Sequence, residues 1–279
     1  MSSSTDRVPT LPLQGHGEIP QLGFGVWEVP AGDTADVVTH ALQAGYRHID
    51  TASIYGNEAG VGQAVHASGL PRDEVFVTTK CFNNDQGRDK AMRACKHSLE
   101  QLGMEYVDLY LIHWPVPSAD LYVETWKAFI ELREEGLVRA IGVSNFQPAH
   151  LARLQAETGV QPVINQVELH PYFQQPGLRR EHADRGILTE AWSPLGKGAS
   201  FAEPVVTTIA EAHGKTPAQV VIRWHLQLGN VVIPRSVNEE RIRENLDVLD
   251  FHLTPADMDA METIDAGDRT GPDPDVNMR

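Results

Sequence analysis

Four side chains with complementary chemistry occur in the first half of the chain, close to the ends of predicted strands. Asp50, Lys80 and His113 each close or follow a predicted strand, and Tyr55 follows Asp50 on a short loop. A phenol has a pKa of about 10, and a neighbouring ammonium group lowers that pKa by stabilising the phenolate. Tyr55 beside Lys80 can therefore donate a proton to a developing alkoxide.

The other two residues have supporting tasks in the same chemistry. Asp50 can pair with Lys80 and hold it in place, and His113 can hydrogen-bond a carbonyl oxygen and orient it. Each residue alone has an ordinary structural explanation, as a capping acid, a packing tyrosine, a surface lysine or a core histidine. Together they could serve acid–base chemistry such as the reduction of a carbonyl group, in which a proton must reach the developing alkoxide.

Alternating strands and helices position these residues. Apolar periodicity and Gly and Pro punctuation predict strands at 22–26, 46–50, 75–80, 107–112, 138–143, 162–167, 187–191 and 231–234. They predict helices at 34–44, 58–68, 89–102, 121–135, 148–157, 177–185, 204–213, 218–228, 239–246 and 255–263, after a small hairpin at 10–13 and 18–20.

Eight strands that alternate with helices predict a parallel sheet, and this chain length fits a closed (β/α)₈ TIM barrel of the α/β class. The alternative is an open doubly wound sheet, which usually has a G-x-G-x-x-G turn after its first strand. Here Gly23-Phe24-Gly25 lacks the third glycine. We therefore expect one barrel domain over residues 10–265, a flexible tail at 1–9 and a C-terminal loop at 266–279.

Composition excludes several classes of function. The chain has 279 residues and a formal net charge of -15, which argues against binding nucleic acid. Its two cysteines form no CxxC pair, and there is no secretory or transmembrane pattern. The expectation is a soluble cytoplasmic protein that binds neither a membrane nor nucleic acid.

Several partial motifs fail on inspection. Gly214-Lys215-Thr216 resembles the end of a phosphate loop, but Ile209 replaces the first glycine of that motif. The segment from Gly142 to Phe146 lacks the final glycine of a nucleophile elbow. No third ligand accompanies His113 and His170 at metal-site spacing, so we expect no metal.

Long blocks of the sequence resemble the aldo-keto reductase family, in particular its bacterial 2,5-diketo-D-gluconate reductase-like branch. The matching blocks are 45–50, 54–58, 107–115, 142–146, 165–171 and 233–245. The resemblance implies that Asp50, Tyr55, Lys80 and His113 are the catalytic tetrad. It also implies NADPH as the cofactor, because no protein side chain can supply a hydride.

The cofactor residues follow from the same resemblance. Ser144, Asn145 and Gln166 match positions that bind the carboxamide, and Trp192 matches the aromatic residue that stacks on nicotinamide. Ser193, Leu195 and Gly196 match the loop along the pyrophosphate. The adenosine 2′-phosphate site matches Arg235, Ser236, Val237, Arg241, Glu244 and Asn245.

The residues around 235–245 also indicate an anion site without the resemblance, because a helix follows the eighth strand there and two arginines lie near its start. The family more often has Lys at the position of Arg235, and some bacterial members have a basic residue at the position of Asn238. We therefore expect a preference for NADPH over NADH that is not absolute.

The expected substrate pocket contains Trp27, Phe82 and Trp114. Phe82 follows Cys81 where many relatives have Leu-Trp, which widens the pocket, and Cys81 is expected to be buried. The loop at 114–120 and the tail after Asp265 are short. These features favour small aldehydes, dicarbonyls or keto-sugars over steroids, in a protein expected to be a monomer.

Two other functions remain open at this point. One is a lyase or aldolase that uses Lys80 as a Schiff-base nucleophile on the same barrel. The other is a regulatory subunit that binds the cofactor without turnover. The intact set of four catalytic residues argues against the second.

Overall fold

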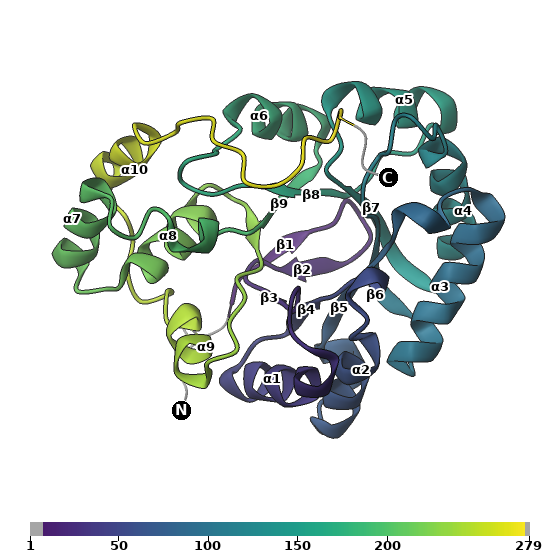
Figure 1. Cartoon of the computed structure of the whole chain (residues 1–279), viewed down its shortest axis with the longest axis horizontal. Coiled ribbons are helices and arrows are strands. Elements are labelled where there is room, and N and C mark those ends of the chain that lie inside the picture. Colours follow the sequence, from purple (N-terminus) through teal and green to yellow (C-terminus); the bar gives the residue numbers. More distant parts are fainter. Residues whose placement is uncertain (1–7, 277–279) are drawn as a thin grey trace.

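The computed structural model describes residues 8–276 and contains an eight-stranded parallel barrel surrounded by helices (Figure 1). The expected (β/α)₈ fold is confirmed. Each strand pairs in parallel with the next along the chain, in the order β3 (Phe24–Gly25), β4 (His48–Asp50), β5 (Phe76–Cys81), β6 (Val107–Ile112), β7 (Val138–Ser144), β8 (Ile164–Glu168), β9 (Leu188–Trp192) and β10 (Val231–Val232). A parallel bridge between Leu22 and Val232 joins the first strand to the last.

The helices pack around the outside of the barrel. They are α1 (Ala31–Ala44), α2 (Glu58–Ala67), α3 (Arg88–Leu102), α4 (Tyr122–Glu134), α5 (Pro148–Thr158), α6 (Pro176–Arg185), α7 (Pro204–His213), α8 (Pro217–Gln227), α9 (Glu239–Leu246) and α10 (Pro255–Glu262). Four short 3₁₀ helices lie in the connections: η1 (Ser53–Tyr55), η2 (Arg72–Glu74), η3 (Asn83–Asp85) and η4 (Gly196–Gly198).

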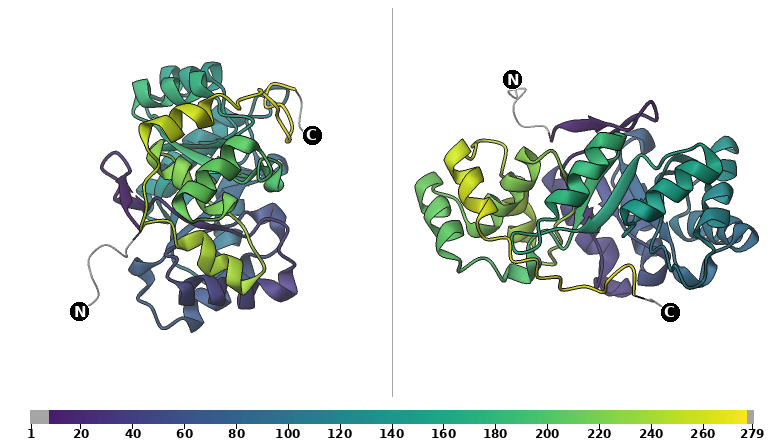
Figure 2. Two further views of the ribbon diagram at one scale, coloured as in Figure 1. Left: turned by 90° about the vertical axis from the view of Figure 1, so that its left-hand side faces the viewer. Right: turned by 90° about the horizontal axis from the view of Figure 1, so that it is seen from above.

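An antiparallel hairpin of β1 (Thr10–Pro12) and β2 (Glu18–Pro20) covers the N-terminal end of the barrel, as the sequence predicts. Leu13 and Ile19 from this hairpin are completely buried in a cluster with barrel-interior residues such as Leu109. Seen from above, the hairpin and the C-terminal segment lie at opposite ends of the barrel (Figure 2, right). Barrel enzymes place their active sites at the C-terminal ends of the strands, which here is the end beside the C-terminal segment.

One glycine allows the barrel interior to pack closely. A Cβ atom added to Gly142 on β7 would lie 2.7 Å from side-chain atoms of Leu111 and Ile164. Both of these side chains are fully buried. A larger residue at 142 would therefore displace the strands on either side, because interiors are close-packed.

Proline and its capping partners explain where several helices begin earlier than expected. Helices α6 and α8 begin at Pro176 and Pro217, one residue before the predicted starts. Proline suits the first helical position, since its missing N–H would have no partner there. At α8 the hydroxyl of Thr216 accepts a hydrogen bond from the amide of Gln219, and the Gln219 side chain accepts one in return.

Three strands at or next to the closing seam are shorter than predicted, and the one expected at 22–26, β3, is only Phe24–Gly25. The strand expected at 231–234 is only Val231–Val232, because Pro234 has no N–H to continue the ladder. At the start of β4, the amide of Tyr46 instead donates to the carbonyl of Ala41 and ends α1. That strand begins at His48 rather than at 46.

The two ends of the chain differ in what can be described. Most of the tail expected at 1–9 lies outside the described residues. The C-terminal segment 266–276 has no helix or strand, in agreement with the sequence. It is nevertheless attached to the barrel, because the amides of Ala266 and Asp268 donate to the carbonyl of Tyr172. The domain limits at 10 and 265 stay a prediction.

Candidate active site

The four predicted catalytic residues lie on neighbouring elements at the C-terminal end of the barrel. Asp50 is the last residue of β4, Lys80 lies one residue before the end of β5, and His113 directly follows β6. Tyr55 is the last residue of η1. The hydroxyl of Ser53 donates to the carbonyl of Lys80 at 3.0 Å, which ties η1 to β5 and brings Tyr55 beside Lys80.

Lys80 is completely buried, and two oxygen atoms hold its ammonium group. Its Nζ donates to Asp50 Oδ1 at 2.6 Å and to the carbonyl of Thr51 at 2.8 Å. The second carboxylate oxygen, Asp50 Oδ2, accepts from Gln166 Nε2 at 2.8 Å. Burial alone would lower the pKa of Lys80, but the charge of Asp50 raises it above the usual value. The lysine is therefore a firmly charged ammonium group.

This charge state argues against the Schiff-base alternative. A nucleophilic lysine needs a neutral amine, which enzymes obtain by lowering its pKa. In this protein the Lys80 pKa moves in the opposite direction and its ammonium group is engaged by two oxygen acceptors.

Tyr55 lies against the ammonium group of Lys80. The Lys80 Nζ is 5.2 Å from the centroid of the Tyr55 ring. Burial raises the pKa of Tyr55, while the charge of Lys80 acts in the opposite direction and lowers it. The predicted influence of Lys80 is thus present, but burial outweighs it, and the phenol remains protonated at neutral pH.

His113 is a neutral imidazole between two aromatic rings. Its ring meets Tyr55 and Phe82 edge-on, at centroid distances of 5.8 and 5.7 Å. Burial, followed by the charge of Lys80, holds the pKa of His113 well below its usual value. Its Nδ1 is buried without a hydrogen-bond partner among the described residues. A proton on Nε2 avoids leaving an unsatisfied N–H at that position and makes Nε2 a donor.

The predicted carboxamide-binding residues form one hydrogen-bonded group. Asn145 Nδ2 donates to the carbonyl of His113 and to Ser144 Oγ, both at 3.0 Å. Trp192 Nε1 donates to Asn145 Oδ1 at 2.9 Å, and Ser144 Oγ donates to the carbonyl of Gln166 at 2.8 Å. The structure therefore brings these four residues together and next to the catalytic group.

The predicted pyrophosphate loop and the anion site lie nearby, after β9 and β10. Ser193 and Gly196 both have positive φ, 48° and 52°. Gly196 is buried, and a Cβ atom there would lie 3.3 Å from the His170 ring. The remaining residue of this loop, Leu195, is partly buried against the core.

Helix α9 begins where the sequence predicts. The side chain of Asn238 caps it by accepting from the amide of Arg241 at 2.9 Å. Ser236 Oγ accepts from the amide of Asn238 at 3.1 Å, and Val237 is exposed. Arg235 is also exposed, but its Nη1 already donates to Glu28 Oε2 at 3.3 Å.

The last three residues expected at the adenosine 2′-phosphate site, Arg241, Glu244 and Asn245, differ in their exposure and contacts. Glu244 Oε1 accepts from Thr216 Oγ1 at 2.6 Å, which ties this side chain to the start of α8. Asn245 is buried, whereas Arg241 is exposed. Of Asn245 and Arg241, only Arg241 has a side chain that a ligand can reach from solvent.

Comparisons with known proteins identify the family of the chain. Residues 21–266 match the model of the Aldo/keto reductase family. The chain belongs to the aldo/keto reductase family. It is an oxidoreductase that reduces carbonyl groups.

The family relatives match over nearly their whole length. An aldo-keto reductase of Mycolicibacterium smegmatis is 56% identical over 266 residues, 95% of this chain and 97% of the relative. Methylglyoxal reductase DkgA of Escherichia coli is 51% identical over 265 residues, covering 94% and 96%. The resemblance to the diketogluconate-reductase branch is confirmed.

Solved structures support the same fold. The aldo/keto reductase from Brucella melitensis has a TM-score of 0.91 at 54% identity, covering 92% of this chain and 98% of its own. A mutant of Gox0644 in complex with NADPH has a TM-score of 0.93 at 49% identity, covering 97% and 99%.

The residues expected to line the reductase's substrate pocket range from exposed to buried. Trp27 is 43% exposed, and Lys197 Nζ lies 5.6 Å from its ring centroid. Phe82 lies beside His113, and Trp114 is buried. Cys81 is completely buried and burial raises its pKa, in agreement with the expectation that it is buried rather than reactive.

Sequence reasoning missed a buried acid that holds the C-terminal segment. Glu168, at the end of β8, accepts hydrogen bonds from Thr270 Oγ1 and N and from the amide of Gly271. Burial raises its pKa, but these bonds and one with His170 lower it overall. A Cβ atom on Gly271 would lie 2.4 Å from the Trp192 ring. The segment therefore packs directly on the predicted nicotinamide-stacking residue.

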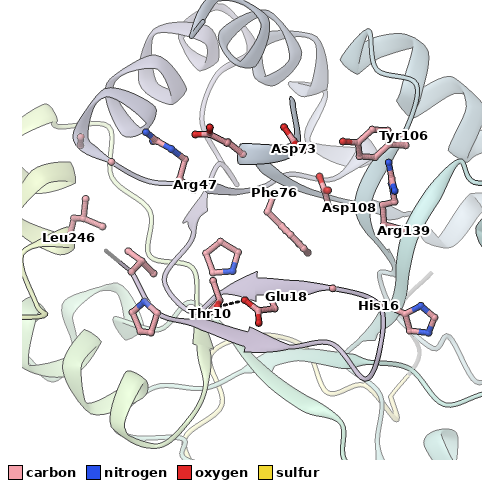
Figure 3. A pocket seen from close by; sticks show the side chains of 17 residues that line it. Thr10, His16, Glu18, Arg47, Asp73, Phe76, Tyr106, Asp108, Arg139 and Leu246 are labelled. Carbon is pink, nitrogen blue, oxygen red and sulfur yellow. Dashed lines mark hydrogen bonds between the residues drawn. The ribbon is translucent and has the colours of Figure 1, made fainter. Parts of the chain in front are cut away.

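A cavity of about 1280 Å³ lies at the other end of the barrel (Figure 3). It lies between the β1–β2 hairpin and the starts of the strands, where Phe76, Asp108 and Arg139 line it. No predicted site residue contributes to it. Barrel enzymes place their chemistry at the opposite end, so this cavity is not the active site.

Two kinds of feature are absent from residues 8–276. No group of three or more His, Cys, Asp or Glu side chains is arranged there to hold a metal ion. No helix within this range is long and apolar enough to cross a membrane.

Proposed function

We propose that this chain reduces small aldehydes, dicarbonyls or keto-sugars to alcohols, with Tyr55 as the proton donor. The observation that carries the proposal is the buried ammonium group of Lys80, which is fixed by Asp50 and lies beside the Tyr55 ring. An ammonium group at that position stabilises the phenolate that forms when Tyr55 gives up its proton.

The residues at the catalytic end have separate tasks in this reaction. His113 donates a hydrogen bond from Nε2 to the substrate carbonyl oxygen and fixes its orientation. The hydroxyl proton of Tyr55 passes to that oxygen as negative charge develops on it. Asp50 and the carbonyl of Thr51 keep Lys80 in place throughout. NADPH, when bound, supplies the hydride that the carbonyl carbon receives.

The donor set of this chain fits such a cofactor. The amides of Asn145 and Gln166 and the hydroxyl of Ser144 lie together beside the aromatic ring of Trp192, where they bond to one another and to neighbouring groups. A bound carboxamide would take over some of these hydrogen bonds. The close approach of the Gly196 backbone to its neighbours suits a loop lying along a pyrophosphate. Arg235 and Arg241, beside the start of α9, suit a 2′-phosphate.

Replacing Tyr55 with phenylalanine tests the role of the hydroxyl group. Tyr55→Phe removes the proton donor but leaves the cofactor residues unchanged. General acid catalysis contributes about 10² to 10⁴-fold, so we expect kcat to fall by that factor. Binding of NADPH, followed by quenching of tryptophan fluorescence, should stay within about threefold of wild type. Activity within a factor of two of wild type contradicts the assignment.

The substrate class rests on the short segments around the site. The connection from His113 to α4 spans only residues 114–121, and the C-terminal segment lies across Trp192. A bulky apolar ligand gains affinity mainly from buried area, which short loops cannot cover. We expect kcat/KM for methylglyoxal, phenylglyoxal and diketogluconate to exceed that for a 3-ketosteroid. The reverse order contradicts the proposal.

We also propose that the enzyme works as a monomer in the cytoplasm. All the proposed catalytic residues come from one chain, so no partner is needed to complete the site. Size-exclusion chromatography with light scattering should give the mass of one chain, 30.8 kDa. A stable dimer contradicts this proposal.

A further inference from the structure

Glu190 is a buried acid to which the proposed mechanism assigns no task. It lies in the middle of β9, is completely buried, and pairs in register with Gln166 on β8. Neither of its carboxyl oxygens has a hydrogen-bond partner among the described residues. An ionised carboxylate in that position is costly, because no donor replaces the water it has lost.

The neighbours of Glu190 do not supply a compensating charge. Burial lowers the pKa of His48, whose Nε2 is 3.9 Å from Glu190 Oε1, to about 3, so this imidazole is neutral. The charge of Lys80 is already balanced by Asp50 at 2.6 Å. The register partner on β10, Val231, carries no charge. The titratable and charged groups that act on this region of the interior are His48 and Asp50 from β4, Lys80 from β5 and Tyr55 from η1.

The carboxyl group of Glu190 is therefore neutral at neutral pH and can ionise at alkaline pH. Burial, followed by the charge of Asp50, raises its pKa to about 8, and the opposing charge of Lys80 offsets only part of this effect. The side-chain amide of Gln166, the register partner of Glu190, donates to Asp50 rather than to Glu190. Ionisation of Glu190 adds one unbalanced negative charge to the group that contains Lys80 and Asp50.

We propose that Glu190 is a positioning residue whose change of charge adjusts how readily Tyr55 gives up its proton. The inference rests on the proposed role of Tyr55 as proton donor. A carboxylate at Glu190 opposes the effect of the Lys80 charge on Tyr55 and raises the pKa of the phenol. It also raises the pKa of Lys80, which keeps that ammonium group charged.

The charge of Glu190 has opposite effects on carbonyl reduction and on alcohol oxidation. Carbonyl reduction needs Tyr55 as the phenol, and an ionised Glu190 preserves the phenol to higher pH. Alcohol oxidation needs the phenolate as the base, and the same charge delays its formation. Glu190 exchanges no proton with the substrate in either direction. It acts only through the electric field inside the barrel.

The test compares pH profiles of wild type and Glu190→Gln at saturating NADPH. Glutamine has the shape of the neutral acid but cannot ionise. We expect kcat for methylglyoxal reduction to match wild type within about twofold below pH 7. The alkaline limb should move to lower pH by roughly one unit, the usual effect of removing one nearby buried charge. For alcohol oxidation at saturating NADP⁺, the pH at which kcat rises should also move to lower values in Glu190→Gln.

Two matched variants separate this effect from a loss of structure. Glu190→Asp keeps an ionisable group and should return the alkaline limb most of the way to wild type. Asp108→Asn removes another largely buried carboxylate, which pairs with Arg72 at the opposite end of the barrel. It should leave the profile unmoved. Alkaline limbs that coincide in wild type and Glu190→Gln overturn the inference, as does an equal shift in Asp108→Asn.

The Tyr55→Phe variant separates a failure of the role proposed for Glu190 from a failure of the role proposed for Tyr55. If Tyr55→Phe is inactive and the limb of Glu190→Gln does not move, only the role of Glu190 is wrong. If Tyr55→Phe remains active, the proton-donor assignment is wrong and the role of Glu190 is wrong with it.

Discussion

Replacing Lys80 with methionine should damage both catalysis and stability, for separable reasons. Methionine has similar length but no charge, so Tyr55 loses the ammonium group that stabilises its phenolate. We expect kcat for methylglyoxal to fall by about 10² to 10⁴-fold. The same change leaves the Asp50 carboxylate buried without its ion pair. Breaking a buried pair on one side costs about 3 to 5 kcal/mol of unfolding free energy.

The loss of unfolding free energy in Lys80→Met should depend on pH, and the direction of this dependence follows from the pKa of Asp50. Burial raises the pKa of Asp50, and in Lys80→Met the opposing charge of Lys80 is absent. A carboxyl group whose folded pKa exceeds its unfolded pKa destabilises the protein when ionised, and this penalty disappears as pH falls through the folded pKa. Lys80→Met should therefore be closer to wild type in stability at pH 5.5 than at pH 8.

A double variant provides the control. In Lys80→Met/Asp50→Asn the orphaned charge is gone, and the asparagine carbonyl can still accept from Gln166 Nε2. Thermal unfolding at pH 8 should show a Tm about 6 to 15 °C below wild type for Lys80→Met and a smaller loss for the double variant. Both variants should be equally inactive. Recovered activity, or a double variant no more stable than the single one, refutes the reasoning.

Two further predictions concern the cofactor and the C-terminal segment. Wild type should bind NADPH at least about tenfold more tightly than NADH, since charge-assisted hydrogen bonds contribute roughly 1.5 to 3 kcal/mol each. The ratio is not larger because Arg235 already donates a hydrogen bond to Glu28. Replacing Arg235 with Gly and Arg241 with His should remove most of that ratio in fluorescence titrations, and equal wild-type affinities contradict the assignment. Glu168→Gln should free residues 270–271, which limited proteolysis would detect as faster cleavage of the C-terminal segment. Because the Glu168 pKa is lowered, its stabilisation is present above about pH 4.5 and lost below, so wild type should become equally susceptible only in acid.

The fold and the clustering of the four proposed catalytic residues were predictable from the sequence because both depend on local patterns. Gly and Pro mark the ends of the helices, and each catalytic residue lies at or near the end of a strand of β-branched or apolar residues. In a parallel barrel, strand ends gather at one side. This topology alone brings Asp50, Lys80 and His113 together.

The unpredicted contacts join residues that are distant in the sequence. Glu168 is held by Thr270, and Gln166 donates to Asp50 from across the barrel. Arg235 pairs with Glu28 at the other end of the chain. No local pattern encodes such pairs. The sequence does contain a signal for Glu190, which lies in the middle of a predicted strand. Side chains along a strand point alternately inward and outward, and an acid at an inward position has no contact with solvent.

The closing seam of the barrel also determines when a growing chain can finish folding. The amide of Gly23 donates to the carbonyl of Val232, and Gln21 Nε2 donates to the carbonyls of Leu226 and Asn230. The first barrel strand, β3, can pair with β4 early, but the residues just before it wait for partners that lie 205 or more residues further along the chain. Until Val232 has emerged, one edge of the nascent sheet is unpaired, and such edges promote association between chains. We therefore expect the nascent chain to be most open to association with other chains before Val232 has been made.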